Sequence, residues 1–440
     1  MKTNFNQLKK AKTFQELFGA LDISLFISSA LVISLGLVIT PFIALFTGYD
    51  SYMYTYILLF GYLGCVLTLF SFIKSRFAFK FSNKKYFTEN IIPIFLFIML
   101  LWAIPSTLLA SDFDTAFYGS IYRQDGLLTA FAYCGYFGCG YIAAKGNKLH
   151  YIFNLFSVIA VILTILMIID SPSLNMYFRT TQIHSVFYQK NHAGYYFCMA
   201  TILSAIEILK LNLKIKKEKI IFFIRLIILG ICFYGNILTN STGSFLGIVF
   251  GGCCLIFATA LFNKDILKHA IFIFSTLIIV TIISVFTGKS PLLDALQVFI
   301  DFGIILKDSR SEEALAAGTT RWRLWLGAIQ FIKEKPWFGF GPDCLQPEYL
   351  RIGIVDGRPH CEPLQFAAEL GVPAAIAYLV SIITFTVTFF KKKVSNPIVI
   401  GLVCTVGAYF CSSLFGLTFF YTAPFFYMIF GMATSVLKRE

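Results

Sequence analysis

The chain has 440 residues, of which 58% are hydrophobic and only 13% are charged, and its formal net charge is +13. With a mean hydropathy of +0.76, the composition excludes a soluble globular protein of this length. It indicates a polytopic membrane protein. The positive charge needs no nucleic-acid partner, because cations in cytoplasmic loops set membrane topology and attract anionic lipids.

The apolar residues fall into runs long enough to cross a bilayer, for which about 20 residues per helix are needed. We therefore predict an all-α membrane protein with about 12 transmembrane helices. Residues 1–22 carry several lysines but no small-residue cleavage site, so they are expected to form a cytoplasmic amphipathic lead-in to a retained first helix. The expected helices lie near residues 23–46, 54–73, 91–110, 127–144, 151–169, 194–210, 220–238, 244–262, 268–286, 371–390, 397–415 and 418–437.

The distribution of lysine and arginine orients these helices. With the N-terminus in the cytoplasm, most of the 36 cations fall in cytoplasmic segments. Both termini are then cytoplasmic. The predicted organisation is the lead-in at 1–22, transmembrane helices 1 to 9 at 23–286, a large outward-facing loop subdomain at 287–370, and helices 10 to 12 with a short cytoplasmic tail at 371–440.

Two shorter outward loops carry polar groups at the membrane surface. Arg123 lies in residues 111–126, and it is either a solvated loop residue or a cation that faces a bound substrate. The second loop, residues 170–194, ends in a compact donor-rich group suited to a phosphate or a sugar, although such residues also commonly face lipid headgroups. This group consists of Lys190, Asn191 and His192, and the same loop holds Arg179 and His184.

The long loop contains the most polar stretch of the chain, residues 318–373, in which two short helices are predicted. The first begins near Arg321 and has apolar side chains at the i, i+3, i+4, i+7 spacing. The two preceding threonines are expected to cap it. The turn PWFGFGP then ends it. The expected capping residues are Thr319 and Thr320. The apolar positions are Trp322, Trp325, Leu326, Ile329 and Ile332.

The second helix is expected to begin at Pro363, because proline suits the first helical position, and to end at Gly371. His360 therefore lies just before a helix N-terminus. Cys361 follows it and Cys344 lies in the same loop, so a disulfide between them is one open alternative, which spacing alone does not decide. The other cysteines fall within predicted spans, where a thiol acts as a small apolar residue.

The order of these residues resembles the O-antigen ligase and O-antigen polymerase family of membrane glycosyltransferases. The family pattern is an arginine four residues before a tryptophan, a proline-glycine turn, and then histidine-asparagine followed by a helix that ends in glutamate-leucine-glycine. Here the pattern starts at Arg321 and continues as HCEPLQFAAELGVPAAIAYL from His360 to Leu379, with Cys361 in place of the asparagine. Relatives often carry a further arginine at the position that aligns with Thr242.

The resemblance implies a reaction, a compartment and partners. The reaction is the inverting transfer of a glycan from an undecaprenyl or other polyprenyl pyrophosphate carrier to a hydroxyl of an acceptor glycan, lipid or protein, in polysaccharide biosynthesis for the cell envelope. The compartment is the bacterial cytoplasmic membrane, with the active site on its outer side. Polymerase and ligase share these motifs, so the choice between them stays open. Arg123 or Lys190 would replace the missing arginine as a phosphate ligand.

This transfer needs groups for the leaving pyrophosphate and for the attacking hydroxyl. Arg321 offers a guanidinium and the free amides of a helix N-terminus, and both stabilise phosphate charge. Arg323 should face away, since two residues are about 200° apart on a helix. His360 is the expected general base, because the helix dipole disfavours its cationic form. Glu362 and Glu369 either orient this histidine, bind sugar hydroxyls or face solvent.

No cofactor or metal is expected, because the five histidines are scattered and the outward acidic residues lack the spacing of metal ligands. A transporter or flippase of lipid-linked glycans is the alternative function, since many spans suit it equally. Such a protein would normally place ionisable residues near the middle of the membrane. No lysine, arginine, aspartate or glutamate occupies the middle of a predicted span, which favours the transferase.

Overall fold

The computed structural model describes residues 22–47, 51–78, 89–121, 123–169, 186–187, 189–288, 290–417 and 419–440. The predicted lead-in up to residue 21, and the loop residues Arg179 and His184, lie outside this part of the chain. Within it every regular element is a helix, which confirms the all-α class.

The helices follow one another with short connections. In chain order they are α3 (Ile23–Val38), α4 (Thr40–Thr47), α5 (Ser51–Ala78), α7 (Ile91–Leu108), α8 (Phe113–Tyr118), α9 (Leu127–Ala143), α10 (Leu149–Ile169), α12 (Lys190–Leu209), α13 (Lys216–Leu238), α14 (Thr242–Phe262), the 3-10 turn η2 (Lys264–Ile266), α15 (Leu267–Phe286), α16 (Leu292–Lys307), α17 (Glu312–Ala316), α18 (Arg321–Glu334), α19 (Gln346–Arg351), α20 (Glu362–Glu369), α21 (Val372–Lys392), α22 (Pro397–Ser413) and α23 (Ala423–Arg439).

Each predicted span overlaps one helix or the bent pair α3 and α4, although α23 begins five residues after the predicted start of the last span. In the described residues, 8 helices are long and apolar enough to cross a membrane, or 9 if the bent pair is one span. The helices α9 and α22 are apolar but shorter, with 17 residues each. The chain is thus a multi-pass membrane protein, and the count of about 12 spans stays a prediction.

The bend between α3 and α4 measures 43° and has a local cause. Pro41 has no backbone N–H, so it cannot donate to the carbonyl of Leu37. The hydroxyl of Thr40 donates to that carbonyl instead, at 2.8 Å. The chain thereby turns inside an apolar region without leaving the carbonyl unpaired.

Glycines bring the central helices into close contact. A Cβ added at Gly140 of α9 would overlap the carbonyl oxygen of Met428 in α23, and one at Gly431 of α23 would overlap that of Phe137 in α9. Small residues at such crossings let helix backbones approach within a membrane. The pair α9 and α23 therefore forms a rigid centre, against which α5 and α3 also pack.

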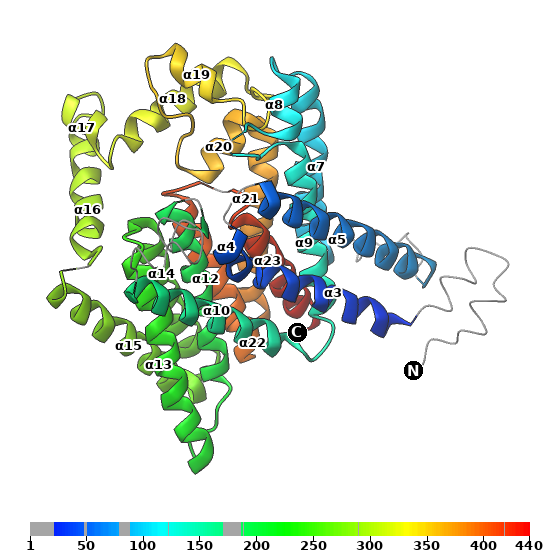
Figure 1. The fold of residues 1–440 in the computed structure, drawn as a ribbon, viewed down its shortest axis with the longest axis vertical. Coiled ribbons are helices and arrows are strands. Elements are labelled where there is room, and N and C mark those ends of the chain that lie inside the picture. Colours follow the sequence, from blue (N-terminus) through cyan, green and yellow to red (C-terminus); the bar gives the residue numbers. More distant parts are fainter. Residues whose placement is uncertain are drawn as a thin grey trace.

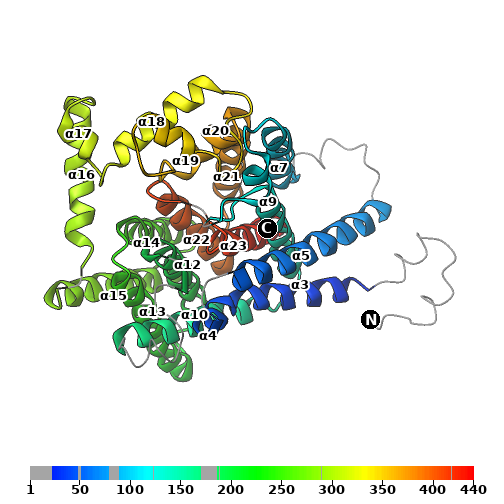
Figure 2. The same cartoon turned by 45° about the horizontal axis from the view of Figure 1, so that its top comes forward.

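The helices α16 to α20 lie at one end of the molecule and belong to the predicted loop region. In both views α18, α19 and α20 lie together next to α21, while α16 and α17 stand to one side (Figure 1, Figure 2). The helices α18, α19 and α20 and the segment between α18 and α19 share a second hydrophobic cluster, separate from the main core, which consists of Leu324, Phe331, Phe340, Leu345, Tyr349 and Ala368. This cluster gives the polar segments around it a fixed support.

Candidate functional site

The proline-glycine turn after α18 is held against the end of α20. The backbone N–H groups of Phe340 and Gly341 donate to the carbonyls of Ala368 and Glu369, at 3.0 and 2.9 Å. The Ser106 hydroxyl also donates to the Glu369 carbonyl, at 2.9 Å. These bonds satisfy carbonyls that a helix C-terminus leaves unpaired. The turn and α20 therefore form one unit.

His360 lies just before α20, as predicted, because Cys361 is the N-cap of that helix. Its φ of 51° is left-handed, a conformation that a residue other than glycine rarely adopts. Its Nε2 lies 3.1 Å from Oδ2 of Asp356. Partial burial would raise the pKa of Asp356, but the hydrogen bond and charge of His360 outweigh this and lower it below its ordinary value. Asp356 therefore stands ready to orient the imidazole.

Arg123 comes from the loop between α8 and α9, yet it lies beside the His360 turn. Its Nη1 donates to the carbonyl of Gly357 at 3.3 Å. A Cβ at Gly357 would crowd the Arg123 guanidinium, so glycine is needed for this approach. Burial, with the nearby charge of Arg358, lowers the pKa of Arg123. Arg123 is therefore not a fully solvated loop residue, and its contact with a substrate stays a prediction.

A fully buried arginine, Arg358, connects the elements of this region. Its Nη1 donates to Oδ2 of Asp125 at 3.1 Å, and its Nη2 donates to Oδ1 of Asp343 at 2.7 Å. Its Nε lies 4.0 Å from Oε1 of Glu369, and its guanidinium carbon lies 4.3 Å from the centre of the Phe419 ring. We call Arg358, Asp125, Asp343 and Glu369 the buried ion network.

Each carboxylate of the buried ion network has further partners. Asp343 accepts bonds at 2.8 Å from both the backbone N–H and the hydroxyl of Ser120. Burial alone would raise the pKa of Asp343, but Arg358 and these bonds lower it. Burial raises the pKa of Asp125, although Arg358 opposes the shift. The network thus holds the arginine and at least one ionised carboxylate away from water.

The two glutamates of α20 differ from their sequence-based roles. Glu362 is buried and accepts a bond from the Tyr378 hydroxyl at 2.7 Å. Glu369 is buried beside Arg358, and burial raises its pKa to about 8. Neither faces solvent, and the side chain bonded to His360 is Asp356. Because α20 turns both carboxylates into the protein interior, the solvent-facing alternative is excluded, and Asp356 holds the place beside His360 that a glutamate was expected to take. Contact of Glu362 and Glu369 with sugar hydroxyls stays a prediction.

The segment before α18 has an unusual backbone. Gly318, Thr319 and Thr320 all have left-handed φ angles, of 62°, 56° and 70°. The threonine hydroxyls donate to the carbonyls of the residues before them, so the predicted threonine cap is wrong. A left-handed residue followed by a helical one directs successive N–H groups into a concave anion-binding arrangement. The first turn of α18 therefore offers backbone donors next to Arg321.

Arg321 begins α18 as predicted, but the buried face of the helix differs from the prediction. The buried positions are not the tryptophans, because the small Gly327 lets Tyr349 pack directly against the helix. Arg321 lies three residues before the buried Leu324 and therefore borders this face. Its Nη1 donates to the Gly318 carbonyl at 3.1 Å, whereas Arg323 is exposed. The residues on the buried face are Leu324, Gly327, Ala328 and Phe331.

The predicted donor group at the start of α12 is not one group. Lys190 is exposed and Asn191 is half-buried. His192 is only 1% exposed, and neither of its ring nitrogens has a hydrogen-bond partner. Its ring packs edge-on against Phe419 at 4.6 Å, and it lies within electrostatic reach of Arg358 and His360. The three residues diverge because successive side chains on a helix point about 100° apart.

Comparison with known protein families supports an assignment. Residues 227–379 match the model of the O-antigen ligase family. The chain carries an O-antigen ligase domain. This supports its assignment to the O-antigen ligase and polymerase family of membrane glycosyltransferases. No curated protein and no solved structure shows significant similarity to the chain.

The O-antigen ligase domain contains most of the site but not all of it. Arg321, Asp356, Arg358 and His360 lie inside it. Arg123, Asp125 and His192 precede it in the sequence and reach it only through the fold. Sequence reasoning did not single out Asp125, Asp343, Asp356 or Arg358. The spacing of Asp356 four residues before His360 was the only local signal for any of them.

The thiols of the O-antigen ligase domain play no linking role in this structure. Cys344 and Cys361 are both buried and not joined by a disulfide. Burial raises the pKa of Cys344 to about 12 and that of Cys361 to about 11. The described residues also contain no group of three or more His, Cys, Asp or Glu side chains placed to hold a metal ion.

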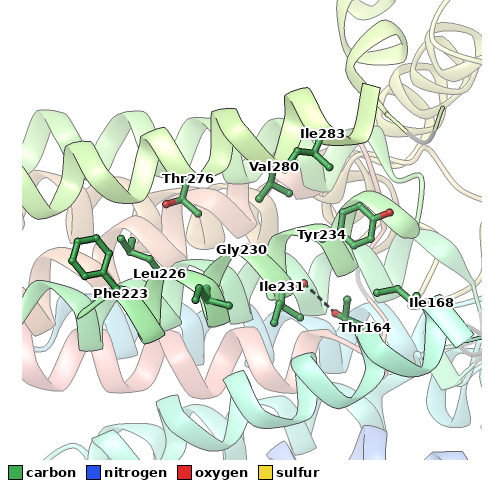
Figure 3. A pocket seen from close by; sticks show the side chains of 11 residues that line it. Thr164, Ile168, Phe223, Leu226, Gly230, Ile231, Tyr234, Thr276, Val280 and Ile283 are labelled. Carbon is green, nitrogen blue, oxygen red and sulfur yellow. Dashed lines mark hydrogen bonds between the residues drawn. The ribbon is translucent and has the colours of Figure 1, made fainter. Parts of the chain in front are cut away.

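An apolar groove of about 480 Å³ lies away from the polar site. It runs between α10, α13 and α15, and it contains none of the predicted site residues (Figure 3). The Thr164 hydroxyl of α10 donates to the Ile231 carbonyl of α13 at 3.2 Å at one wall. Since its lining is almost wholly apolar, the groove offers no groups for glycosyl transfer.

Proposed function

We propose that the protein is an inverting glycosyltransferase that moves a glycan from a polyprenyl-pyrophosphate carrier to a hydroxyl acceptor. The observation that carries the proposal is the O-antigen ligase domain, within which Arg321 begins α18 and His360 pairs with Asp356. The transfer takes place on the outer face of the bacterial cytoplasmic membrane, during synthesis of a cell-surface polysaccharide.

In this proposal His360 takes the proton of the attacking hydroxyl. When the Nε2–H donates to Asp356, the lone pair is on Nδ1, which accepts the proton. The hydroxyl oxygen then bonds to the anomeric carbon as the bond from that carbon to the pyrophosphate oxygen breaks. The carboxylate of Asp356 holds the ring and balances the positive charge that forms on it.

Arg321 and the first turn of α18 stabilise the leaving pyrophosphate. The guanidinium supplies positive charge. The N–H groups of the first turn beyond Arg321 supply oriented dipoles, since the N–H of Arg321 itself donates to the Gly318 carbonyl. Arg123 supplies a second cation beside the His360 turn. It replaces the arginine that the resembled family often carries at the position of Thr242. Pyrophosphate is a weak base, so the step needs no general acid, and we propose that it needs no metal or other cofactor.

The proposal is tested with purified protein in liposomes that contain a radiolabelled lipid-linked glycan. Transfer yields a new glycosyl bond on an added acceptor or on a second lipid-linked chain. Growth of the lipid-linked chain identifies a polymerase, and labelling of a separate acceptor identifies a ligase. If the glycan only moves between leaflets with its bond to the carrier intact, the protein is a flippase and the proposal fails.

A further inference from the structure

Two hydrogen bonds hold the turn that carries His360. Asp356 and His360 are bonded to each other across residues 357–359, and Arg123 holds the Gly357 carbonyl. From the middle of this turn the Arg358 side chain enters the protein interior. A left-handed histidine persists only where its surroundings hold it in place. The place of His360 therefore depends on what fixes the middle of the turn.

We propose that Arg358 is a positioning residue, which fixes the His360 turn by joining four separate segments through its buried guanidinium. The inference rests on the proposed role of His360 as the base. The segments are the loop before α9 with Asp125, the turn after α18 with Asp343, the end of α20 with Glu369, and the residues before α23 with Phe419.

The geometry requires an arginine. Two nitrogens of its guanidinium donate to different carboxylates, and the guanidinium carbon lies over the Phe419 ring. The ammonium of a lysine is a point charge, which keeps the attraction but loses the forked bonding and the stacking. Arg358→Lys therefore separates the effect of charge from the effect of position.

Arg351 provides a matched control. It also pairs with two carboxylates, Glu334 and Glu348, but its side chain is 50% exposed and it lies on α19, outside the site. Exposed pairs of this kind contribute little. We expect Arg351→Lys and Arg351→Met to keep the turnover and the melting temperature of the wild type.

The main test compares turnover, donor affinity and melting temperature in the full-length protein. We expect Arg358→Lys to lower kcat by about 10²-fold, as misplacement of a catalytic group by about 1 Å does. Donor affinity should change much less than kcat. A variant that keeps full kcat overturns the proposal, and so does a loss of kcat that only follows a loss of folded protein.

A double replacement separates positioning from stability. Arg358→Met alone leaves buried carboxylates without their cation and should lower the melting temperature. Adding Asp343→Asn removes one of these charges, while the amide oxygen still accepts from Ser120. We expect the double variant to regain stability but not kcat. Recovery of both would mean that Arg358 acts only through stability.

A second readout does not need activity. Cys361 follows His360 and is 7% exposed. If Arg358 fixes the turn, Arg358→Lys should increase maleimide labelling of Cys361, measured by mass spectrometry relative to the labelling of the same cysteine after denaturation. Unchanged labelling overturns the proposal. A wild-type protein that transfers no glycan overturns the proposed function, and the labelling result still decides the role of Arg358.

Discussion

The Nε2 atom of His360 lies 3.1 Å from Oδ2 of Asp356, so the expected base and its carboxylate partner come from one turn of the chain. The pair resembles the histidine-carboxylate arrangement that fixes the tautomer of a catalytic imidazole. It differs from a buried pair, since the Asp356 side chain is 47% exposed. The turn therefore has to be fixed by contacts other than the pair itself.

The first prediction concerns this pair. His360→Ala should lower turnover by at least about 10²-fold, the usual size of general-base catalysis, while donor affinity stays near that of the wild type. Asp356→Asn should lower turnover less, because the amide still accepts the Nε2–H but no longer balances the developing charge. Turnover at saturating donor and equilibrium binding of the lipid-linked donor measure the two effects. Full turnover of His360→Ala would assign the proton to another group.

The second prediction compares the two arginines of α18. Arg321→Ala should weaken donor binding as well as turnover, because the pyrophosphate is charged before and during bond cleavage. Arg321→Lys should recover only part of both. Arg323→Ala is the matched control, since its exposed side chain lies away from the buried edge of the helix. An indispensable Arg323 with a dispensable Arg321 would contradict the site.

The third prediction concerns topology. A cysteine at Glu312 should react with an impermeant thiol reagent in intact cells once any outer layer is passed, with the parent protein as the control for its native cysteines. A cysteine at Lys216 should not react. Both positions are exposed on the protein surface, so the difference reports the side of the membrane. The reverse pattern would place the site in the cytoplasm.

The fourth prediction concerns pH. Burial raises the pKa of Glu369 to about 8 from its ordinary 4.5, so between these values the folded protein keeps a proton that the unfolded chain releases. The contribution of Glu369 to folding is therefore complete below 4.5 and declines as the pH rises toward about 8. The melting temperature of the wild type relative to Glu369→Gln should fall across this window. A difference that does not change with pH would mean that Glu369 is ionised throughout.

The fifth prediction concerns the turn against α20. Gly371 has a φ of 95°, and a Cβ there would overlap the Trp337 carbonyl oxygen. Gly353 has a φ of 73° with nothing within 4 Å of its added Cβ. Gly353→Ala should therefore cost only the strain of the left-handed backbone, about 1–2 kcal/mol. Gly371→Ala should cost clearly more, measured as the melting temperature and the yield of folded protein.

The positions of the helices followed from hydropathy, because a backbone in lipid must pair its own polar groups and an apolar run of about 20 residues does so as a helix. The bend at Thr40 was not predicted, since Pro41 near the end of an apolar run can equally continue a span. The apolar face of α18 was misjudged for a different reason. Tryptophans count as apolar, yet the small Gly327 decides which face Tyr349 can approach.

The sequence singled out His360, Arg321 and Arg123 as candidates, because their residue types suit the chemistry and their neighbours have local signals. The buried ion network had no such signal. Charged residues are rarely fully buried, so a sequence argument assigns Arg358 and Asp343 to the surface. The ion pair between Arg358 and Asp125 joins residues more than two hundred positions apart, and no periodicity links such residues.

The contact between Arg358 and Phe419 also concerns synthesis of the protein. The network needs Asp125 from the first third of the chain and an aromatic ring close to its C-terminal end. A nascent chain that has not yet released the residues around Phe419 from the ribosome therefore lacks one wall of the site. If the protein transfers glycan as proposed, chains that end before Phe419 should therefore lack turnover.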